Sequence, residues 1–416
     1  MDADDDARKL LAAAVPPNVR DVCATLTKAG HQAVVVGGAV RDALLGRRPG
    51  DWDVASSAHP NEVMVLFRHT VATGVQHGTV TIVTGRGEHF HVEVTTFRGE
   101  GAYTDARRPD SVTFGVPLVE DLARRDLVVN AIAYDPANDR IIDPFGGRVD
   151  LERKVLRAVG TAVDRFTEDG LRVMRAVRFA AQLEFALDPE TEAGIAPSLP
   201  SLVKVSRERV SDELRKMLGA PRPSLGLALA KRTGILATVV PALDAAIDDV
   251  AAWLARIDRA PEPSRLAALF APLRERKRIV DIAKALKFSN TEADLAGKLA
   301  AALPRPEDPE PTPFSVREQF SKLGRDVARQ LLELWTLETP ALPHAAIGTR
   351  VIDDPFLASE LAVDGTDVMK ALDLGPGRSL GRILTSLHTY VLEEPAHNTR
   401  EQLLERAKQL ELELGR

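Results

Sequence analysis

Alternating apolar and polar residues predict β-strands in the first third of the chain. The alternation runs through QAVVV at 32–36, TVTIV at 79–83 and HFHVEVTTF at 89–97, with turn residues between them. After about residue 155 the apolar positions recur at helical spacing, as in RERVSDELRKML at 207–218. The pattern therefore predicts an α+β fold, in which a mixed sheet with helices is followed by an all-α remainder.

A proline-rich segment interrupts the helical part. In LPRPEDPEPTPF, residues 303–314, five prolines prevent a continuous helix and favour an extended spacer. We expect a domain junction there. The acidic start of the chain is expected to be a loose end.

Composition excludes disordered and fibrous proteins. The chain has 416 residues, 44% of them hydrophobic, and its 54 basic and 60 acidic side chains give a net charge of -6, so no global cationic field points to a nucleic acid. A single cysteine, Cys23, cannot form an internal disulfide and favours a reducing compartment. The opening MDADDDARKL does not resemble a secretory signal, and no apolar run reaches the ~18 residues of a membrane span. These features predict a cytoplasmic protein.

The segment VVVGGAVRDALLGRRPGDWDVASS, residues 34–57, carries the clearest chemical signal. A short apolar strand meets Gly37 and Gly38, and a helical stretch follows. Backbone amides gather at such a turn and suit a phosphate group. The alternative is a tight strand-to-helix turn without a ligand.

Asp51 and Asp53 follow this turn and flank Trp52. On a strand, the period of two places both carboxylates on one face and directs Trp52 and Val54 to the core. Such carboxylates repel each other unless a cation lies between them, and their oxygens suit magnesium. An aspartate-rich surface turn is the alternative.

A third carboxylate, Glu93, lies in HFHVEVTTFR. Alternation directs Phe90, Val92 and Val94 inward, and leaves His91, Glu93 and Thr95 on the opposite face. Glu93 is a candidate to complete the metal site or to activate a hydroxyl nucleophile, or it is an ordinary exposed residue. His89 and His91 have the spacing of a metal pair, but no further ligand follows at zinc-like spacing.

The string GGAVRDALLGRRPGDWD resembles the opening motif of the class II tRNA nucleotidyltransferases, the CCA-adding enzymes, and of the related bacterial poly(A) polymerases, within the polymerase β nucleotidyltransferase superfamily. Further segments resemble family motifs in the same order along nearly the whole chain: RRDLVVNAIAYD at 124–135 for ribose recognition, DPFGGRVDL at 143–151 for a hinge, EDGLRVMRAVRFAAQL at 168–183 for nucleotide selection, SRERVSDEL at 206–214, and the tail stretch AVDGTDVMKALDLGPGRSLGRIL.

The resemblance implies roles for individual residues. It assigns two Mg²⁺ ions to Asp51 and Asp53, the triphosphate to Gly37 and Gly38, and a weaker phosphate contact to Arg41. Within the ribose motif it assigns the sugar to Arg125 and Asp126, with Asn130 following. The chain departs from the family pattern at Leu127, Val128 and Ser56, and none of these changes removes a group that the chemistry needs.

Asp169 and Arg172 are three residues apart, so a helix would present a carboxylate beside a guanidinium. That pair matches the edges of cytosine and adenine, whereas uracil and guanine would set a carbonyl against the carboxylate. An ordinary surface ion pair is the alternative. Arg175 and Arg178 continue the helix and are candidates for phosphate contact, although solvated charge or helix-end pairing explains them as well.

The loop at 96–114 and the tail extend the resemblance. Gly and charged residues predict a mobile loop, and in the family a loop here is needed for terminal A addition. In the tail, glycine-rich turn amides and basic side chains are candidates for tRNA contact, or for plain helix packing, at Lys370, Gly375, Gly377, Arg378 and Arg382. No histidine is followed by Asp, so no added phosphohydrolase activity is expected.

The resemblance implies template-independent addition of CCA to tRNA from CTP and ATP. It divides the chain into a catalytic head (1–153), a neck (154–217), a body (218–303) and a tRNA-binding tail (314–416). The alternatives are an enzyme that adds only A or only CC, a poly(A) polymerase, and a catalytically silent RNA-binding protein.

Overall fold

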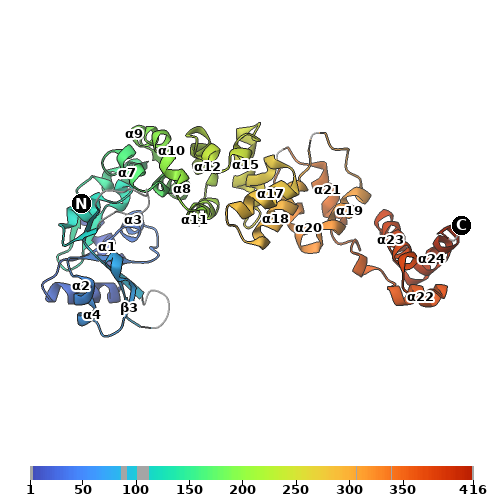
Figure 1. Cartoon of the computed structure of the whole chain (residues 1–416), viewed down its shortest axis with the longest axis horizontal. Coiled ribbons are helices and arrows are strands. Elements are labelled where there is room, and N and C mark those ends of the chain that lie inside the picture. The colour runs from blue at the N-terminus through green and yellow to red at the C-terminus, as the bar shows by residue number, and fades with distance from the viewer. Residues whose placement is uncertain (1–2, 86–90, 101–111, 306, 339, 415–416) are drawn as a thin grey trace. The chain divides into compact units, whose positions relative to one another are not determined.

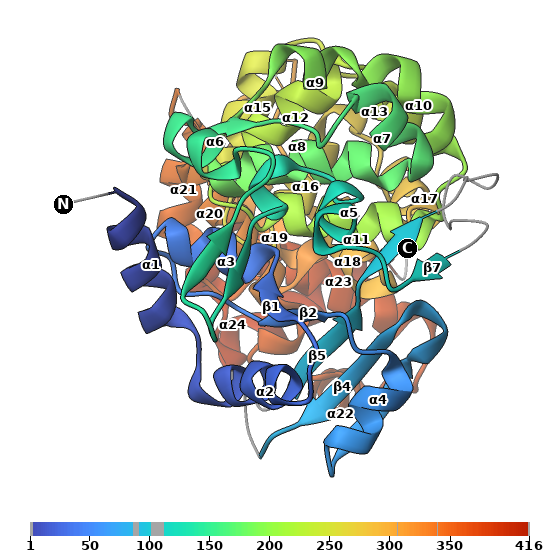
Figure 2. The ribbon, with the colours of Figure 1, turned by 90° about the vertical axis from the view of Figure 1, so that its left-hand side faces the viewer.

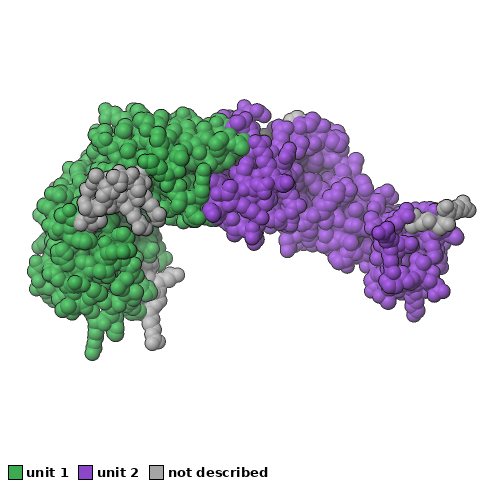
Figure 3. Space-filling model, in the orientation of Figure 1, with its two compact units in different colours: residues 1–244 green, residues 245–416 purple. Residues whose placement is uncertain are grey.

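The computed structural model describes residues 3–85, 91–100, 112–305, 307–338 and 340–414. The chain forms two compact units, Met1–Asp244 and Ala245–Arg416 (Figure 3). Sheet and helices share the first unit, and helices make up the second, as the ribbon in Figure 1 shows. The predicted α+β class, with an N-terminal mixed sheet and a helical remainder, is confirmed.

A seven-stranded mixed sheet organises the described part of the head in the order β3-β4-β5-β2-β1-β8-β9. Its strands are β1 (Ala33–Val36), β2 (Asp53–Ser56), β3 (Thr70–Gly74), β4 (Thr79–Val83), β5 (His91–Thr96), β8 (Ala133–Asp135) and β9 (Arg140–Ile142). β1 is buried along its whole length because it lies inside the sheet. β2 and β5 run parallel, while the other neighbouring strands are antiparallel. The strands predicted near 32–36, 79–83 and 89–97 therefore form, the last from residue 91.

Helices cover this sheet, and Figure 2 shows α2 and α4 beside its strands. The elements of this region are α1 (Ala3–Ala14), α2 (Pro17–Lys28), α3 (Gly38–Leu44), α4 (Pro60–Leu66), η1 (Val75–His77), α5 (Leu118–Ala123), η2 (Val128–Asn130) and α6 (Gly147–Arg153), with a hairpin of β6 (Arg98–Glu100) and β7 (Val112–Phe114). Val34 and Val36 pack with Leu122 and Val128 in one apolar cluster, which joins β1 to α5 and η2.

The rest of the first unit is helical apart from one small sheet. Its helices are α7 (Ala162–Glu168), α8 (Leu171–Leu183), α9 (Pro189–Ala193), α10 (Ile195–Val203), α11 (Arg207–Leu218), α12 (Pro223–Arg232), α13 (Ile235–Val239) and α14 (Pro241–Asp244). β10 (Val155–Leu156) pairs in parallel with β11 (Ala186–Leu187), although the sequence pattern shows no strands there. α12 approaches α8 closely at Gly226, where a Cβ would lie 2.5 Å from the Val177 carbonyl oxygen.

The second unit contains α15 (Val250–Arg259), α16 (Arg265–Phe270), η3 (Ala271–Leu273), α17 (Arg276–Ala285), α18 (Asn290–Ala301), α19 (Pro313–Leu323), α20 (Arg325–Thr336), α21 (Pro343–Val351), η4 (Ala358–Glu360), α22 (Gly365–Leu372), α23 (Arg378–Glu393), η5 (Pro395–His397) and α24 (Arg400–Leu414). No helix forms in the described residues between α18 and α19, as the prolines there predict. Both α18 and α19 belong to the second unit, so the boundary between the two compact units does not fall at the proline-rich segment. The division into head, neck, body and tail stays a prediction.

Candidate functional site

The glycine turn joins β1 to α3, as predicted. Gly37 has φ 79° and ψ -140°, a backbone conformation that residues with a Cβ rarely adopt. A Cβ at Gly37 would lie 3.0 Å from Nη1 of Arg125, and one at Gly38 would lie 3.5 Å from Nη2 of Arg41. Two guanidinium groups therefore lie close to the turn at the end of a central strand.

Two of the candidate metal carboxylates, Asp53 and Glu93, lie on neighbouring strands of the sheet, and Asp51 stands two residues before Asp53, the first residue of β2. Asp53 is in register with Glu93 of β5, and on its other side with Val36, the residue before the turn. Asp51, Asp53 and Glu93 are exposed, whereas Trp52 is 5% exposed. The predicted alternation is therefore confirmed, and it also holds for Val54, Val92 and Val94, which are buried.

Electrostatics make this carboxylate group suitable for a cation. Although part of the Asp53 side chain is exposed, desolvation of its carboxylate by the surrounding protein raises its pKa to about 6, and Glu93 and then Asp51 act in the same direction, against the opposing effect of Arg125. A divalent cation would offset the repulsion, and the donors are all carboxylate oxygens, which fit Mg²⁺. Within the described residues, no group of three or more His, Cys, Asp and Glu side chains could hold a metal ion.

The structure describes one of the two histidines that have the spacing of a metal pair. His91 is exposed at the start of β5. His89 and Phe90 lie outside the described residues, and so do residues 101–111 of the predicted mobile loop.

Arg125 links the turn to the carboxylates. Its Nη1 donates to the backbone oxygen of Asn130 at 3.5 Å, and its Nη2 lies 3.7 Å from Oδ2 of Asp121. Burial lowers the pKa of Arg125, although it stays a cation under ordinary conditions. Because its charge also acts on Asp53, Arg125 lies where a phosphate or a sugar could bind between turn and carboxylates.

Asp126 is the centre of a buried polar network. Its Oδ1 accepts hydrogen bonds from the Leu127 amide at 2.8 Å and from Asn130 Nδ2 at 3.1 Å, while its Oδ2 accepts one from Arg175 Nε at 2.7 Å. Burial alone would raise the pKa of Asp126, but Arg175 and the hydrogen bonds hold it well below its usual range. Arg41 Nη1 donates to Asn130 Oδ1 at 2.6 Å, which joins α3 to the ribose motif.

The departures from the family pattern within this region are structural. Leu127 and Val128 are 0% and 1% exposed and belong to the core. Ser56 is buried, and its hydroxyl donates to the Gln32 carbonyl oxygen at 2.8 Å.

The structure corrects the predicted placement of Asp169. This residue does not lie on a helix with Arg172, because α7 ends at Glu168 and α8 begins at Leu171. Asp169 has an extended backbone, with φ -133° and ψ 106°. The break falls where Gly170 meets α10: a Cβ on Gly170 would lie 2.3 Å from the carbonyl carbon of Ser201.

Both side chains of the predicted selecting pair have other partners. Asp169 receives two hydrogen bonds from Arg209 of α11, Nη2 to Oδ2 at 2.7 Å and Nη1 to Oδ1 at 3.3 Å. Arg172 is 9% exposed and pairs with Glu168 through a short contact, while its Nη2 donates to the Arg124 carbonyl oxygen at 3.0 Å. Asp169 and Arg172 are thus each oriented by partners of their own at the start of α8.

Arg175 and Arg178 both have protein partners. Arg175 contacts Asp126, and Arg178, 8% exposed, lies 2.6 Å from Glu213 of α11. Three arginines surround the Phe179 ring. The guanidinium carbons of Arg178, Arg41 and Arg175 lie 4.0, 5.0 and 5.5 Å from its centroid.

Sequence reasoning missed Glu168, Phe179, Arg209 and Glu213 as parts of this site. A usable signal exists for two of them. Arg209 and Glu213 are four residues apart in the SRERVSDEL segment and therefore share one face of α11, which packs against α8.

The predicted tail residues gather around one turn of the second unit. The turn connects α22 to α23, and α23 begins directly after Gly377. The five predicted residues are all exposed, which leaves them available to a ligand: Lys370, Gly375, Gly377, Arg378 and Arg382.

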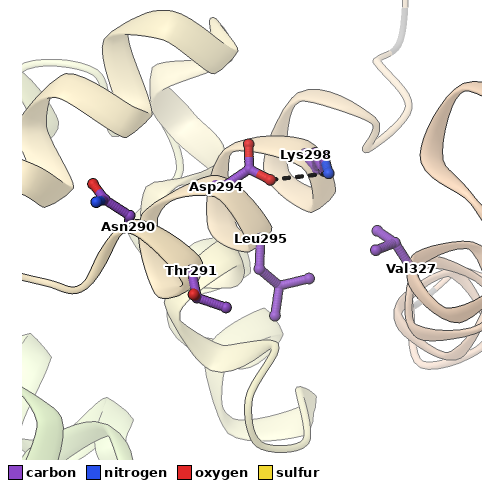
Figure 4. A pocket seen from close by; sticks show the side chains of 6 residues that line it. All are labelled: Asn290, Thr291, Asp294, Leu295, Lys298 and Val327. Carbon is purple, nitrogen blue, oxygen red and sulfur yellow. Dashed lines mark ion pairs between the residues drawn. The ribbon is translucent and has the colours of Figure 1, made fainter.

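Two pockets among the described residues contain none of the predicted site residues. One lies in the second unit between α18 and α20, where Asp294 pairs with Lys298 at 2.9 Å, and its lining residues are Asn290, Thr291, Asp294, Leu295, Lys298 and Val327 (Figure 4). Another, in the first unit, is lined by Gln32, Pro117, Leu118, Val119, Arg140, Ile141 and Ile142. None of the described helices has the length and apolar character needed to cross a membrane.

Comparisons with known proteins identify the family. Residues 33–157 match the model of the poly A polymerase head domain, 184–247 that of the RNA and SrmB-binding site of polymerase A, and 264–407 that of tRNA nucleotidyltransferase domain 2. The CCA-adding enzyme of Geobacillus kaustophilus is 39% identical over 391 residues, which cover 91% of this chain and 93% of that protein.

Solved structures agree. The crystal structure of the Bacillus stearothermophilus CCA-adding enzyme in complex with CTP is 35% identical, with a TM-score of 0.76, and the match covers 96% of this chain and 100% of that one. The Thermotoga maritima CCA-adding enzyme complexed with tRNA_CCA shares the fold at 18% identity, with a TM-score of 0.70 and coverage of 97% and 98%. The chain belongs to the family of the CCA-adding enzymes, which are tRNA nucleotidyltransferases.

Proposed function

We propose that this chain adds CCA to the 3′ end of tRNA from CTP and ATP without a nucleic-acid template. The tRNA 3′-hydroxyl attacks the α-phosphorus of the nucleotide in line, and pyrophosphate leaves. One observation carries the proposal. The exposed carboxylate of Asp53 lies in register with Glu93 on one side and with Val36, the residue before the arginine-flanked glycine turn, on the other.

Asp51 and Asp53 would hold Mg²⁺, for which the family resemblance implies two ions, and Glu93 lies beside them on β5. When bound, the metal lowers the pKa of the attacking hydroxyl and neutralises charge on the pyrophosphate. The exposure of both carboxylates and the raised pKa of Asp53 support this assignment. Glu93 is the second candidate for holding the metal or for accepting the hydroxyl proton.

The turn and the ribose motif bind the rest of the nucleotide. Gly37 and Gly38 let a triphosphate approach the backbone, while Arg125 and, more remotely, Arg41 supply positive charge. Asp126 is held ionised, so it accepts hydrogen bonds only. A 2′-hydroxyl can donate to it, whereas a deoxyribose cannot, and this difference favours NTP over dNTP.

Asp169 and Arg172 select the base in this proposal. The carboxylate accepts from the exocyclic amine of cytosine or adenine, and the guanidinium donates to the ring nitrogen. Their partners orient them, Arg209 for Asp169 and Glu168 for Arg172. A bidentate base contact discriminates by about 1 to 3 kcal/mol, so one pair gives roughly hundredfold selection against UTP and GTP.

The second unit would bind the tRNA. The exposed turn with Arg378 and Arg382 offers amides and charge to RNA phosphates, and we propose that this tail region contacts the elbow of tRNA. The division into head (1–153), neck (154–217), body (218–303) and tail (314–416) belongs to the same proposal. A cytoplasmic location suits tRNA processing, and the single, buried Cys23 fits a reducing compartment.

The experiment uses tRNA transcripts that end before CCA, after C and after CC, each with Mg²⁺ and labelled CTP, ATP or both. Three residues added to the shortest transcript, with a stop at CCA, support the proposal. A added only to the CC-ended transcript makes the protein an A-adding enzyme, and two C residues alone make it CC-adding. Long A ladders on unrelated RNA make it a poly(A) polymerase, and no incorporation makes it a silent RNA-binding protein.

Variants test the carboxylates in the same assay. Asp51→Ala and Asp53→Ala should abolish addition while tRNA binding, measured by filter binding, stays near wild type. Asp21→Ala removes an exposed carboxylate from α2 in the same unit and serves as the matched control. Near-normal turnover in either test variant contradicts the metal assignment.

A further inference from the structure

One aromatic ring, Phe179, has three arginines around it. It lies on α8 and is 6% exposed. The guanidinium carbon of Arg178 lies 4.0 Å from the ring centroid, that of Arg41 5.0 Å and that of Arg175 5.5 Å. Guanidinium groups are attracted to the negative face of an aromatic ring, and more strongly where water is excluded, as it is around the buried Arg41 and Arg178.

Each of these arginines also has a polar partner. Arg178 pairs with Glu213, Arg175 with Asp126, and Arg41 both with Asp42 and with the Asn130 side chain. The ring is therefore a surface that α3, through Arg41, shares with two charged positions of α8. An aliphatic side chain of similar size would keep the apolar packing but remove the attraction to all three cations.

The network leaves one acceptor position on Asp126 open. A carboxylate has about four lone-pair sites. Among the described residues, three bonds use them, from the Leu127 amide, Asn130 Nδ2 and Arg175 Nε. Because Arg175 approaches with Nε alone, Oδ2 retains a free lone pair. If the guanidinium rotated into a bidentate contact with the carboxylate, Arg175 would occupy the remaining lone pair of Asp126 Oδ2 as well.

We propose that Phe179 is a positioning residue for sugar recognition. Its ring holds the Arg175 guanidinium in the monodentate contact with Asp126 and keeps Arg41 hydrogen-bonded to the Asn130 side chain. In this way it keeps the remaining lone pair of Asp126 available to the 2′-hydroxyl of the incoming nucleotide. The inference rests on the proposed contact between Asp126 and the ribose, and the experiment separates the two.

The test measures kcat/KM for CTP and for dCTP on a tRNA transcript that lacks CCA, and takes the ratio as its readout. Phe179→Leu should lower the CTP value at least tenfold and change the dCTP value little, so the ratio falls about tenfold. Phe179→Tyr keeps the aromatic face and should keep the ratio within about threefold of wild type. Phe179→Met replaces Phe179→Leu if that variant does not fold, because an unbranched side chain fills irregular space.

Two controls decide between the outcomes. Phe166→Leu removes a fully buried ring from α7 in the same unit and should lower the melting temperature without changing the ratio. Asp126→Asn should abolish the discrimination between CTP and dCTP. If Phe179→Leu lowers both substrates equally, the role of Phe179 is merely structural and the inference is overturned. If Asp126→Asn leaves the ratio unchanged, the proposed ribose contact itself is wrong.

Discussion

Replacing Gly37 by alanine tests the glycine turn directly. The turn needs φ 79° and ψ -140° at this residue, and the new Cβ would lie 3.0 Å from Nη1 of Arg125. Gly46 provides a matched control in the same unit, because it also has a positive φ, 66°, but a Cβ there would meet nothing within 4 Å. Both variants strain the backbone, and only Gly37→Ala displaces a site residue.

The expected magnitudes follow from this difference. Backbone strain costs about 1 to 3 kcal/mol at Gly37 and about 1 to 2 kcal/mol at Gly46, and each kcal/mol lowers Tm by about 2 to 4 °C in a unit of this size. A displacement of about 1 Å at a site costs on the order of a hundredfold in rate. Since Arg125 must move by a fraction of that, we expect kcat/KM to fall about tenfold, or about 1.4 kcal/mol, in Gly37→Ala.

The assay compares both variants with wild type by thermal melting and by single-nucleotide addition of CTP to tRNA. Gly46→Ala should lose a few degrees of Tm, by about the amounts above, and retain full addition. Gly37→Ala should lose a similar amount of Tm and also most of its activity, chiefly through KM for the nucleotide. If the two variants have equal kcat/KM, the turn does not contribute to the nucleotide site, and the reasoning fails.

Further predictions concern charge. Glu213→Gln leaves Arg178 buried without its counterion and should lower the free energy of unfolding by about 3 kcal/mol in denaturant unfolding. Asp294→Asn, in a largely exposed ion pair with Arg276, should lower it by less than about 1 kcal/mol. Equal losses in the two variants would contradict the argument from burial. The lowered pKa of Asp126 means that its stabilising contribution is present above the ordinary pKa of about 4 and is lost as the pH falls toward the folded-state value. The stability gap between wild type and Asp126→Asn should therefore shrink as the pH falls below about 4, and a constant gap would refute this. Mg²⁺ with CTP should raise the Tm of wild type and not that of Asp53→Asn, and chelation should stop addition; an equal shift in both proteins argues against the carboxylate site.

Local patterns were enough for much of the fold. Strand alternation placed Asp53 and Glu93 on an exposed face, because successive side chains of any strand point in opposite directions whatever surrounds it. The glycine turn, α11 and the interruption by prolines follow likewise from backbone limits that each residue carries with it. The order of the family motifs pointed to the family, which the relatives confirm.

The partners of the charged groups depended on tertiary structure. Periodicity predicted one helix through Asp169, but the helix is interrupted there, where the backbone of α10 lies against Gly170. Arg41 meets Asn130 although 89 residues separate them in sequence, and Arg209 reaches Asp169 across 40. The sequence by itself determined which residue types stand on which local face. Which arginine neutralises which carboxylate was decided only by packing, because long side chains can pair with any opposite charge that the fold brings within reach.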